Sequence, residues 1–371
     1  MLESLYTKAI EKKGTIIEEL DDYRDNNLDI SKFWKNEEIP KYVGDLTIAA
    51  GDGSKHEKKF LSFYFYAVAS ETLIYNEKLS TNKLSKIESS DINTMSHGKF
   101  SKDRIRNYMG LFEVKNALKA IKTHNIDYYL YDGSLFGDLI RSYPLKKDIS
   151  QDIISEVLDL AEDKLNEEIK YIENHEVEIY SKKLVNNVLK NKFENIKGKN
   201  SFRNFEKIEN YLENVEKLLA LSNLLKYNDK IIAISKTSAV YDYFNAKSPD
   251  IAIFTKHTQG MGYSFRPKYI TGKKDQFKRE FPVKNDFFKS LVFTTFYVRL
   301  EDNKNILKIE LPYKADETKI REIISIISKD STEGYPYLLK KAHHDVIIKK
   351  KDIEQLSNII GIYEKTGREM L

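Results

Sequence analysis

The sequence predicts an α/β protein in which a mixed sheet is flanked by helices. Two apolar runs of β-type residues, 46–50 and 126–131, each lead into an Asp-Gly-Ser triplet. A segment with helical periodicity, 101–124, lies between them, and strand-type runs return near the C-terminus. This mixture of two-residue and 3.6-residue periods is typical of α/β folds.

The composition narrows the possible chemistry. The 371 residues suit one large domain or two ordinary ones, and the net charge of +4 neither requires nor excludes a nucleic-acid partner. The absence of cysteine excludes disulfides, zinc–thiolate sites and a cysteine nucleophile. Any metal must bind to Asp, Glu, His or backbone oxygen, which favours Mg²⁺ or Mn²⁺ over Zn²⁺. With no signal-peptide pattern and no apolar run of about 18 residues, we expect a soluble, cytoplasmic protein that does not contact a membrane.

The chain divides into four parts. We expect an N-terminal helical segment over 1–43, packed on the core or on a partner, and the first part of the sheet domain over 44–146. A charged helical insertion over 147–228 separates this from the second part, 229–371. Lysine and arginine alternate with asparagine in the insertion, which suits either a phosphate backbone or a solvated helix face.

The first part begins with a predicted hairpin. The strand at 46–50 leads to Asp52, and an aromatic run over 60–71 returns antiparallel to it. The stretch 78–97 is polar and is expected to be a connection. Further along the chain, 248–254 is another strand candidate.

Asp52 and Asp132 are the acids that follow the two β-type runs. The glycine after each acid allows the backbone to turn away, and the strand holds the acid rigidly. Two carboxylates on neighbouring strands repel unless a proton or a divalent cation lies between them. This arrangement is common in metal-dependent phosphoryl-transfer sites. The alternative is a plain turn, since Asp-Gly is a common turn dipeptide.

The helix predicted over 101–124 carries one further acid, Glu113. It borders the apolar stripe of the helix, nineteen residues before Asp132. The helix could therefore place it over the end of the sheet, or Glu113 could be an ordinary surface residue.

The second part of the sheet domain supplies basic and aromatic candidates. A strand over 231–234 is followed by Lys236, which can bind a phosphate or pair with one of the acids. Residues 257–285 are basic and aromatic and contain glycine, as in a loop that follows single-stranded nucleic acid or in a solvated surface loop. The candidate DNA contacts in this loop are Arg266, Lys273 and Lys274.

A hairpin is predicted over 291–313, with Tyr297 and Arg299 on one face by the two-residue period. Helical runs follow, and one of them carries His343 and His344. A histidine pair on a helix is either structural or a metal ligand or general acid/base.

Several short motifs occur in a defined order. They are the strand before Asp52-Gly-Ser, the helix with Glu113, Tyr131-Asp132-Gly-Ser-Leu, Ile234-Ser-Lys236-Thr-Ser, Tyr297-Val-Arg299-Leu, and Gly334-Tyr-Pro-Tyr-Leu followed by Ala342-His343. Together they span nearly the whole chain, from about 44 to 360. In this order they resemble the NurA nucleases, prokaryotic and mainly archaeal DNA-end resection enzymes that partner the hexameric HerA ATPase.

The resemblance implies an RNase H-like fold and a homodimer. The implied activity is 5′–3′ exonuclease and single-strand endonuclease cleavage of DNA with Mn²⁺ or Mg²⁺, in the repair of double-strand breaks. It places metal ligands at Asp52, Glu113 and Asp132. A tyrosine and a histidine complete the site and match Tyr297 and His343, with Phe296 and His344 as the neighbouring alternatives.

The chemistry expected of such a site assigns a role to each residue. The two aspartates would bind the cation directly, and Glu113 would be a ligand or would orient the water. His343 would be a ligand or would protonate the leaving oxygen, and Lys236 and Arg299 would hold non-reacting phosphates.

Two other functions are compatible with the sequence. One is a non-catalytic RNase H-like module that binds DNA or docks on an ATPase, and the other is a different metal-dependent phosphotransferase. The sequence contains no Gly-x4-Gly-Lys-Ser/Thr loop, which argues against an intrinsic NTPase.

Overall fold

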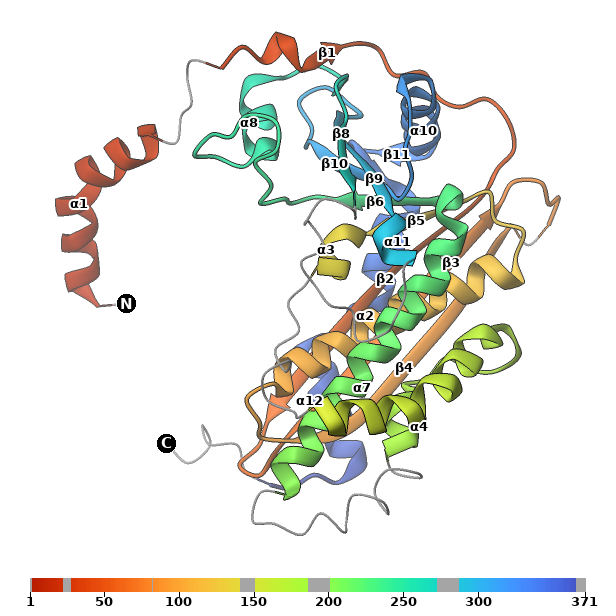
Figure 1. Ribbon diagram of the computed structural model, residues 1–371. Coiled ribbons are helices and arrows are strands. Elements are labelled where there is room, and N and C mark those ends of the chain that lie inside the picture. Colours follow the sequence, from red (N-terminus) through yellow and green to blue (C-terminus); the bar gives the residue numbers. More distant parts are fainter. Residues whose placement is uncertain are drawn as a thin grey trace.

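The computed structural model describes residues 2–22, 28–81, 83–140, 151–185, 201–271 and 287–364. Within these residues, a ten-stranded mixed sheet forms the centre of the molecule and helices cover both of its faces (Figure 1). The α/β class with a mixed, helix-flanked sheet is therefore confirmed.

The sheet has the order β1-β7-β9-β10-β6-β5-β2-β3-β4, and β8 pairs with β9 beside this path. Its strands are β1 (Trp34–Asn36), β2 (Thr47–Lys59), β3 (Phe63–Asn76), β4 (Leu84–Ser96), β5 (Tyr128–Asp132), β6 (Ile231–Ser235), β7 (Gly262–Ser264), β8 (Lys268–Thr271), β9 (Val292–Arg299) and β10 (Leu307–Leu311). Two short strands, β11 (Ser331–Thr332) and β12 (Tyr335–Pro336), pair with each other.

The described α-helices are α1 (Glu3–Asp22), α2 (Ser101–Thr123), α3 (Leu135–Ile140), α4 (Gln151–Lys170), α5 (Tyr180–Leu184), α7 (Ser201–Leu224), α8 (Asp250–His257), α9 (Phe287–Ser290), α10 (Glu317–Lys329), α11 (Tyr337–Val346) and α12 (Lys350–Ile360). Short 3₁₀ turns lie at Ile30–Lys32, Ile172–Asn174 and Leu225–Lys230. None of the helices in the described residues is long and apolar enough to cross a membrane.

Five strands in the middle of the sheet have the RNase H-like arrangement. β2, β3 and β4 form an antiparallel meander, and β5 and then β6 lie parallel to β2 on its other side. β5 pairs with β2 only as far as Gly51, opposite Tyr131, whereas β2 continues to Lys59 alongside β3. Asp52 is therefore the first residue of β2 that no longer pairs with β5.

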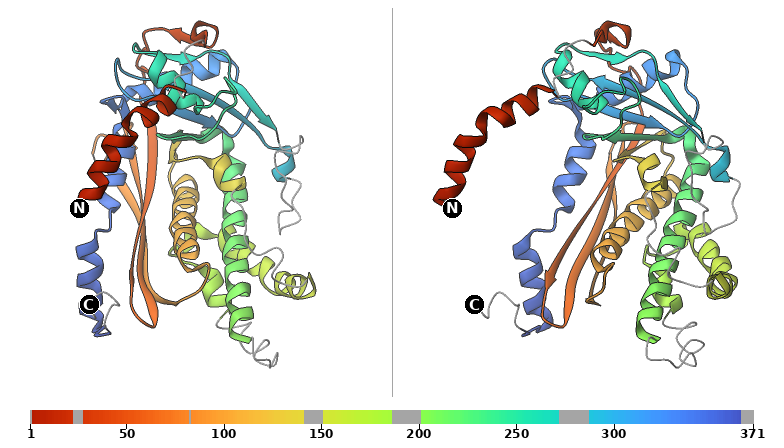
Figure 2. Two further views of the ribbon diagram at one scale, coloured as in Figure 1. Left: turned by 90° about the vertical axis from the view of Figure 1, so that its left-hand side faces the viewer. Right: turned by 60° about the vertical axis from the view of Figure 1, so that its left-hand side comes forward.

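Alternating side chains divide the core into two layers. Ala49, Tyr129 and Ala233 point to the face that α2, α4 and α7 cover. Ala50 and Leu130, among others, point to the opposite face, where α10 and α11 pack. Figure 2 shows α11 and α12 on one side of the long strands and α2 and α7 on the other.

β4 falls in the stretch that was expected to be a polar connection, and that prediction was wrong. It pairs antiparallel with β3 along its length, from Phe63 opposite Ser96 to Tyr75 opposite Leu84. Most of its side chains are exposed because it forms the edge of the sheet. An edge strand with solvent on much of its surface shows no apolar alternation in its sequence.

The strand expected over 248–254 is also wrong, because residues 250–257 form α8. Pro249 directly precedes the helix, and the Asp250 carboxylate accepts hydrogen bonds from the backbone N–H groups of Tyr243 and Phe244. Ile253 and Phe254 are the buried apolar residues of this helix. Adjacent apolar residues fit a buried helix turn as well as a strand.

The N-terminal helix α1 does not pack on the described core. Its side chains over residues 3–20 are exposed, and it stands apart from the sheet in all views (Figures 1 and 2). Packing on a partner stays a prediction.

Candidate metal centre

Asp52 is placed by two glycines on β2. A Cβ at Gly51 would clash with the Tyr129 hydroxyl and lie 2.6 Å from Oγ1 of Thr72, so no larger side chain fits there. Oδ1 of Asp52 accepts a hydrogen bond of 2.8 Å from the backbone N–H of Gly53. These contacts leave Oδ2 to point away from the strand, on the face where α11 packs.

Asp132 ends β5, and the backbone turns sharply after it. Gly133 has φ +113°, a value that L-residues rarely adopt, and its N–H donates to the carbonyl of Ile234 at 2.9 Å. The next residue, Ser134, donates to the buried carboxylate of Glu310 at 2.7 Å. Burial raises the pKa of Asp132, while the ammonium of Lys236, 3.2 Å away, opposes this rise.

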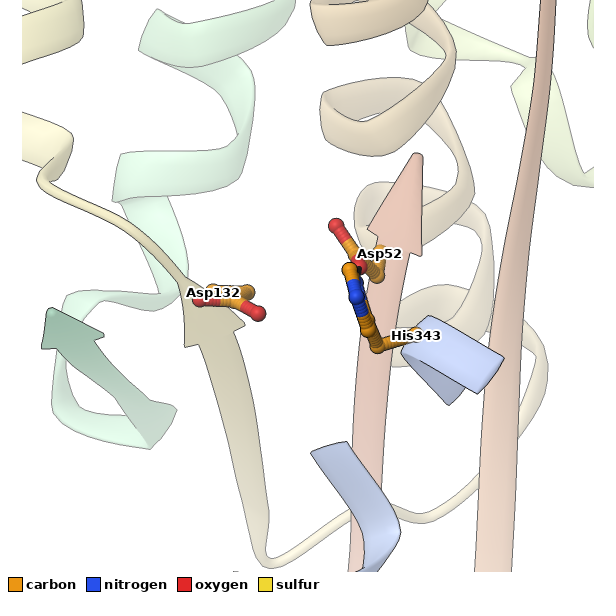
Figure 3. Close-up of side chains that lie close together, drawn as sticks. All are labelled: Asp52, Asp132 and His343. Carbon is orange, nitrogen blue, oxygen red and sulfur yellow. Dashed lines mark hydrogen bonds and ion pairs between the residues drawn. The ribbon is translucent and has the colours of Figure 1, made fainter. Parts of the chain in front are cut away.

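His343 reaches the same place from α11. Its Nδ1 lies 2.6 Å from Oδ2 of Asp52. One potential ligand atom from each of Asp52, Asp132 and His343 lies within 4.8 Å of the others (Figure 3). His344, the alternative, is 86% exposed and faces Asp345 instead.

Glu113 approaches these residues from α2, on the other side of β2. A Cβ at Gly53 would clash with Oε1 of Glu113 and lie 2.9 Å from its Cδ, so the missing side chain of Gly53 makes room for this carboxylate. Burial, together with the charges of Asp52 and Asp138, raises the pKa of Glu113 to about 8. Glu113 thus adjoins the group of three, although its oxygens are not among the ligand atoms within 4.8 Å.

The described residues fit a divalent cation. The three side chains offer carboxylate oxygen and imidazole nitrogen at mutual distances short enough for one ion. Asp52 and Asp132 each raise the pKa of Glu113, so the carboxylates repel one another without a counter-charge. A donor set of carboxylates with one imidazole suits Mn²⁺ well, and the carboxylates alone suit Mg²⁺.

The tyrosine that the structure places at this centre is Tyr335, not Tyr297. The hydroxyl of Tyr335, on β12, donates to Oδ2 of Asp132 at 3.5 Å. Tyr297 is 1% exposed and packs with Tyr243 and Phe254 in a separate aromatic cluster under α8. The two-residue period of β9 turns Tyr297 toward α8, and only the tertiary packing shows which tyrosine meets Asp132.

The predicted DNA-binding residues are distributed unevenly. Lys236 is 44% exposed, and its ammonium lies 4.5 Å from the ring centre of Tyr335 as well as beside Asp132. Arg266 is exposed and lies over the Phe265 ring. Arg299 is only 2% exposed, and its Nη2 donates to the carbonyl of Thr255 at 3.4 Å, so the prediction of a surface phosphate contact is wrong for this side chain. Lys273 and Lys274 lie outside the described residues.

Sequence reasoning missed two groups that surround the acids. Tyr335 belongs to the Gly-Tyr-Pro-Tyr motif, eight residues before His343, and that spacing was the available signal. Lys217 and Asp138, which form an ion pair of 3.1 Å, come from α7 and α3 and had no signal in the sequence pattern.

The family model of the NurA domain matches residues 46–348 of this chain. A probable DNA double-strand break repair nuclease NurA from Methanocaldococcus jannaschii is 34% identical over 385 residues, covering 98% of this chain and 90% of that protein. The DNA double-strand break repair nuclease NurA of Sulfurisphaera tokodaii is 27% identical, covering 98% and 97%.

Solved structures share the fold. The NurA nuclease from Sulfolobus solfataricus superposes with a TM-score of 0.67 at 23% identity, covering 97% of each chain. A NurA crystal structure reaches a TM-score of 0.72 at 16% identity, covering 98% of this chain and 99% of that one. A NurA bound to dAMP and manganese has a TM-score of 0.67 at 17% identity over the full length of both chains.

Proposed function

The chain belongs to the NurA family, and from this premise we propose that it is a metal-dependent DNA nuclease. It would cut single-stranded DNA internally and degrade DNA ends in the 5′–3′ direction during double-strand break repair. The observation that supports this most strongly is the convergence of Asp52, Asp132 and His343 at the ends of RNase H-like strands. Relatives that carry the name DNA double-strand break repair nuclease support the substrate.

We propose Mn²⁺, or Mg²⁺, as the cofactor. Asp52, Asp132 and His343 would hold it, with Glu113 beside them as a further ligand or as the base that orients the attacking water. The bound ion would lower the pKa of its water and stabilise the charge that develops on the phosphate. The NurA crystallised with manganese also binds dAMP, a nucleotide of the kind that an exonuclease would release.

The residues around the ion would transfer protons and bind the phosphate. Without an ion, burial and the neighbouring acids raise the pKa of Glu113 to about 8; a bound cation would favour its anion, the form that can take a proton from water. Lys236 presents its ammonium beside Asp132 and would bind a phosphate oxygen of the DNA. The Tyr335 hydroxyl, next to Asp132, would position the phosphate or donate a proton to the leaving oxygen.

We also propose the partners that the family resemblance implied, a HerA-type hexameric ATPase and a second copy of this chain. Because the sequence has no phosphate-binding loop, any ATP-driven movement along DNA requires a separate motor. With a DNA substrate and an ATPase partner of this kind, we propose that the protein acts in the cytoplasm.

The test is cleavage of single-stranded DNA by purified protein with EDTA and with Mn²⁺ restored. Asp132→Asn should abolish cleavage and leave DNA binding nearly unchanged, since the amide keeps the shape and loses the charge that binds the ion. Asp45→Asn, an exposed acid, is the matched control and should cleave normally. Cleavage by Asp132→Asn at the wild-type rate would rule out this metal centre.

DNA binding without any metal-dependent cleavage by the wild-type protein would support the other function, a non-catalytic module that holds DNA or docks on the ATPase.

A further inference from the structure

Buried ion pairs join helix α7 of the inserted region to α2, the helix that carries Glu113. Arg104 of α2 donates to Glu213 of α7 at 2.9 Å through Nε and at 2.5 Å through Nη2. Lys115 of α2 donates to Glu216 at 2.5 Å. All four side chains are buried. Removing one partner of either pair would leave the other charge buried and unpaired, which is unfavourable. The two pairs therefore favour one register of α7 along α2.

Gly110 lies on α2 between these two ion pairs, and its missing side chain leaves space for the side chain of Lys217 from α7. A Cβ at Gly110 would lie 2.7 Å from Nζ and 3.3 Å from Cε of Lys217. Any residue larger than glycine would therefore push the lysine aside. The lysine side chain is only 10% exposed, so it passes through the interior and not over the surface.

The ammonium of Lys217 ends among the carboxylates behind the metal centre. It lies 3.1 Å from Oδ1 of Asp138, whose Oδ2 accepts a hydrogen bond of 2.7 Å from Tyr131, the residue before Asp132. Oε2 of Glu113 lies 3.9 Å from the same Gly110 Cβ position that the ammonium approaches. The lysine is thus near both Glu113 and the strand that presents Asp132.

We propose that Lys217 is a positioning residue of the nuclease site, and that the helical insertion serves to place its ammonium behind Glu113. Between Glu113 and Asp138 it offsets their mutual repulsion and keeps Glu113 against Gly53, pointing toward Asp52. This inference rests on the proposed nuclease function. It adds a role for the insertion, which contributes no residue to the group of three ligands.

The experiment compares Lys217→Met, which keeps the length of the side chain and removes its charge, with Gly110→Ala, which keeps the charge and displaces it. Alanine favours a helix more than glycine does, which offsets part of the cost of moving the lysine end, so Gly110→Ala should still fold. Lys226→Met, an exposed lysine just beyond α7, is the matched control. Three quantities are measured: the cleavage rate at saturating Mn²⁺, the Kd for Mn²⁺ by calorimetry, and Tm.

We expect both variants to cleave about 10- to 100-fold more slowly, because a displaced Glu113 no longer orients the attacking water beside the ion. The Kd for Mn²⁺ should not rise, because Lys217→Met removes a positive charge near a cation site and Gly110→Ala leaves it nearby. Tm should change little in Gly110→Ala, because the helix preference of alanine offsets the cost of moving the lysine end. Lys226→Met should match the wild type in all three.

Wild-type cleavage rates in either variant would overturn the inference. So would a loss of rate accompanied by a lower Tm and a raised Kd in both variants, because that pattern indicates a purely structural lysine. Either result leaves the proposed function standing if the wild type cleaves with Mn²⁺. A wild type that does not cleave refutes the proposed function itself.

Discussion

Substitution of Glu113 tests how much the repulsion between the clustered carboxylates lowers the stability of the metal-free protein. Its carboxylate is partly buried against Gly53, and burial and the nearby Asp52 and Asp138 raise its pKa to about 8. Glu113→Gln keeps the shape of the side chain and removes the charge. We predict that this substitution abolishes or greatly slows cleavage and yet stabilises the metal-free protein at alkaline pH.

The sign follows from proton linkage. The folded state holds the proton on Glu113 up to pH about 8, whereas the unfolded chain releases it near 4.5. Between these values the folded state binds more protons, so the free energy of unfolding falls as pH rises. A pKa raised from 4.5 to about 8 corresponds to about 5 kcal/mol at about 1.4 kcal/mol per pKa unit. Because the site is partly open to solvent, which screens charges, we expect about 2–3 kcal/mol to be measured.

The assay is denaturant unfolding in EDTA at pH values from 4.5 to 9, with Glu18→Gln as an exposed control on α1. At pH 4.5 the wild type and Glu113→Gln should have the same stability. At pH 9 the variant should be more stable, and the control should show no difference at any pH. A Glu113→Gln protein that is less stable than the wild type at pH 9 would refute the reasoning, since Glu113 would then be stabilised as an anion.

The surroundings of the site lead to three more expected outcomes. Tyr335→Phe should slow cleavage about tenfold or more, whereas Tyr297→Phe should cleave normally, and single-turnover rates at saturating Mn²⁺ compare them directly. Lys115→Met should lower the free energy of unfolding by about 3–5 kcal/mol, because two glutamates stay buried without their partner; equal stability in urea would contradict this. Mn²⁺ at 100 times its Kd should stabilise the wild type by about 2.7 kcal/mol in the same urea titration, and an Asp132→Asn protein that gains as much would place the ion elsewhere.

Some of the site was predictable because its signals are local. Asp52 and Asp132 each end an apolar run and precede a glycine, and the chain needs that glycine at Gly133, where φ is positive. Those features are carried by a few consecutive residues. Glu113 was identified by its place on an amphipathic helix, and His343 by its place in the motif order.

Other parts were not predictable because distant segments determine them. β4 is polar since it forms an edge, and α8 buries apolar residues whose spacing also suits a strand. The choice of Tyr335 over Tyr297 depends on which face of β9 meets α8 and on where the β11–β12 turn brings its tyrosine.

The amino-acid sequence by itself determined the class of the fold, the two aspartates at strand ends and the family. Each of these depends on a periodicity or a short motif that neighbouring residues carry. Only the tertiary structure decided that Lys217 of a helix inserted between β5 and β6 approaches Glu113. The physical reason is that this contact depends on the space that Gly110 of α2 leaves for a side chain of α7. The two helices are far apart in the sequence, so no periodicity within either one predicts the contact.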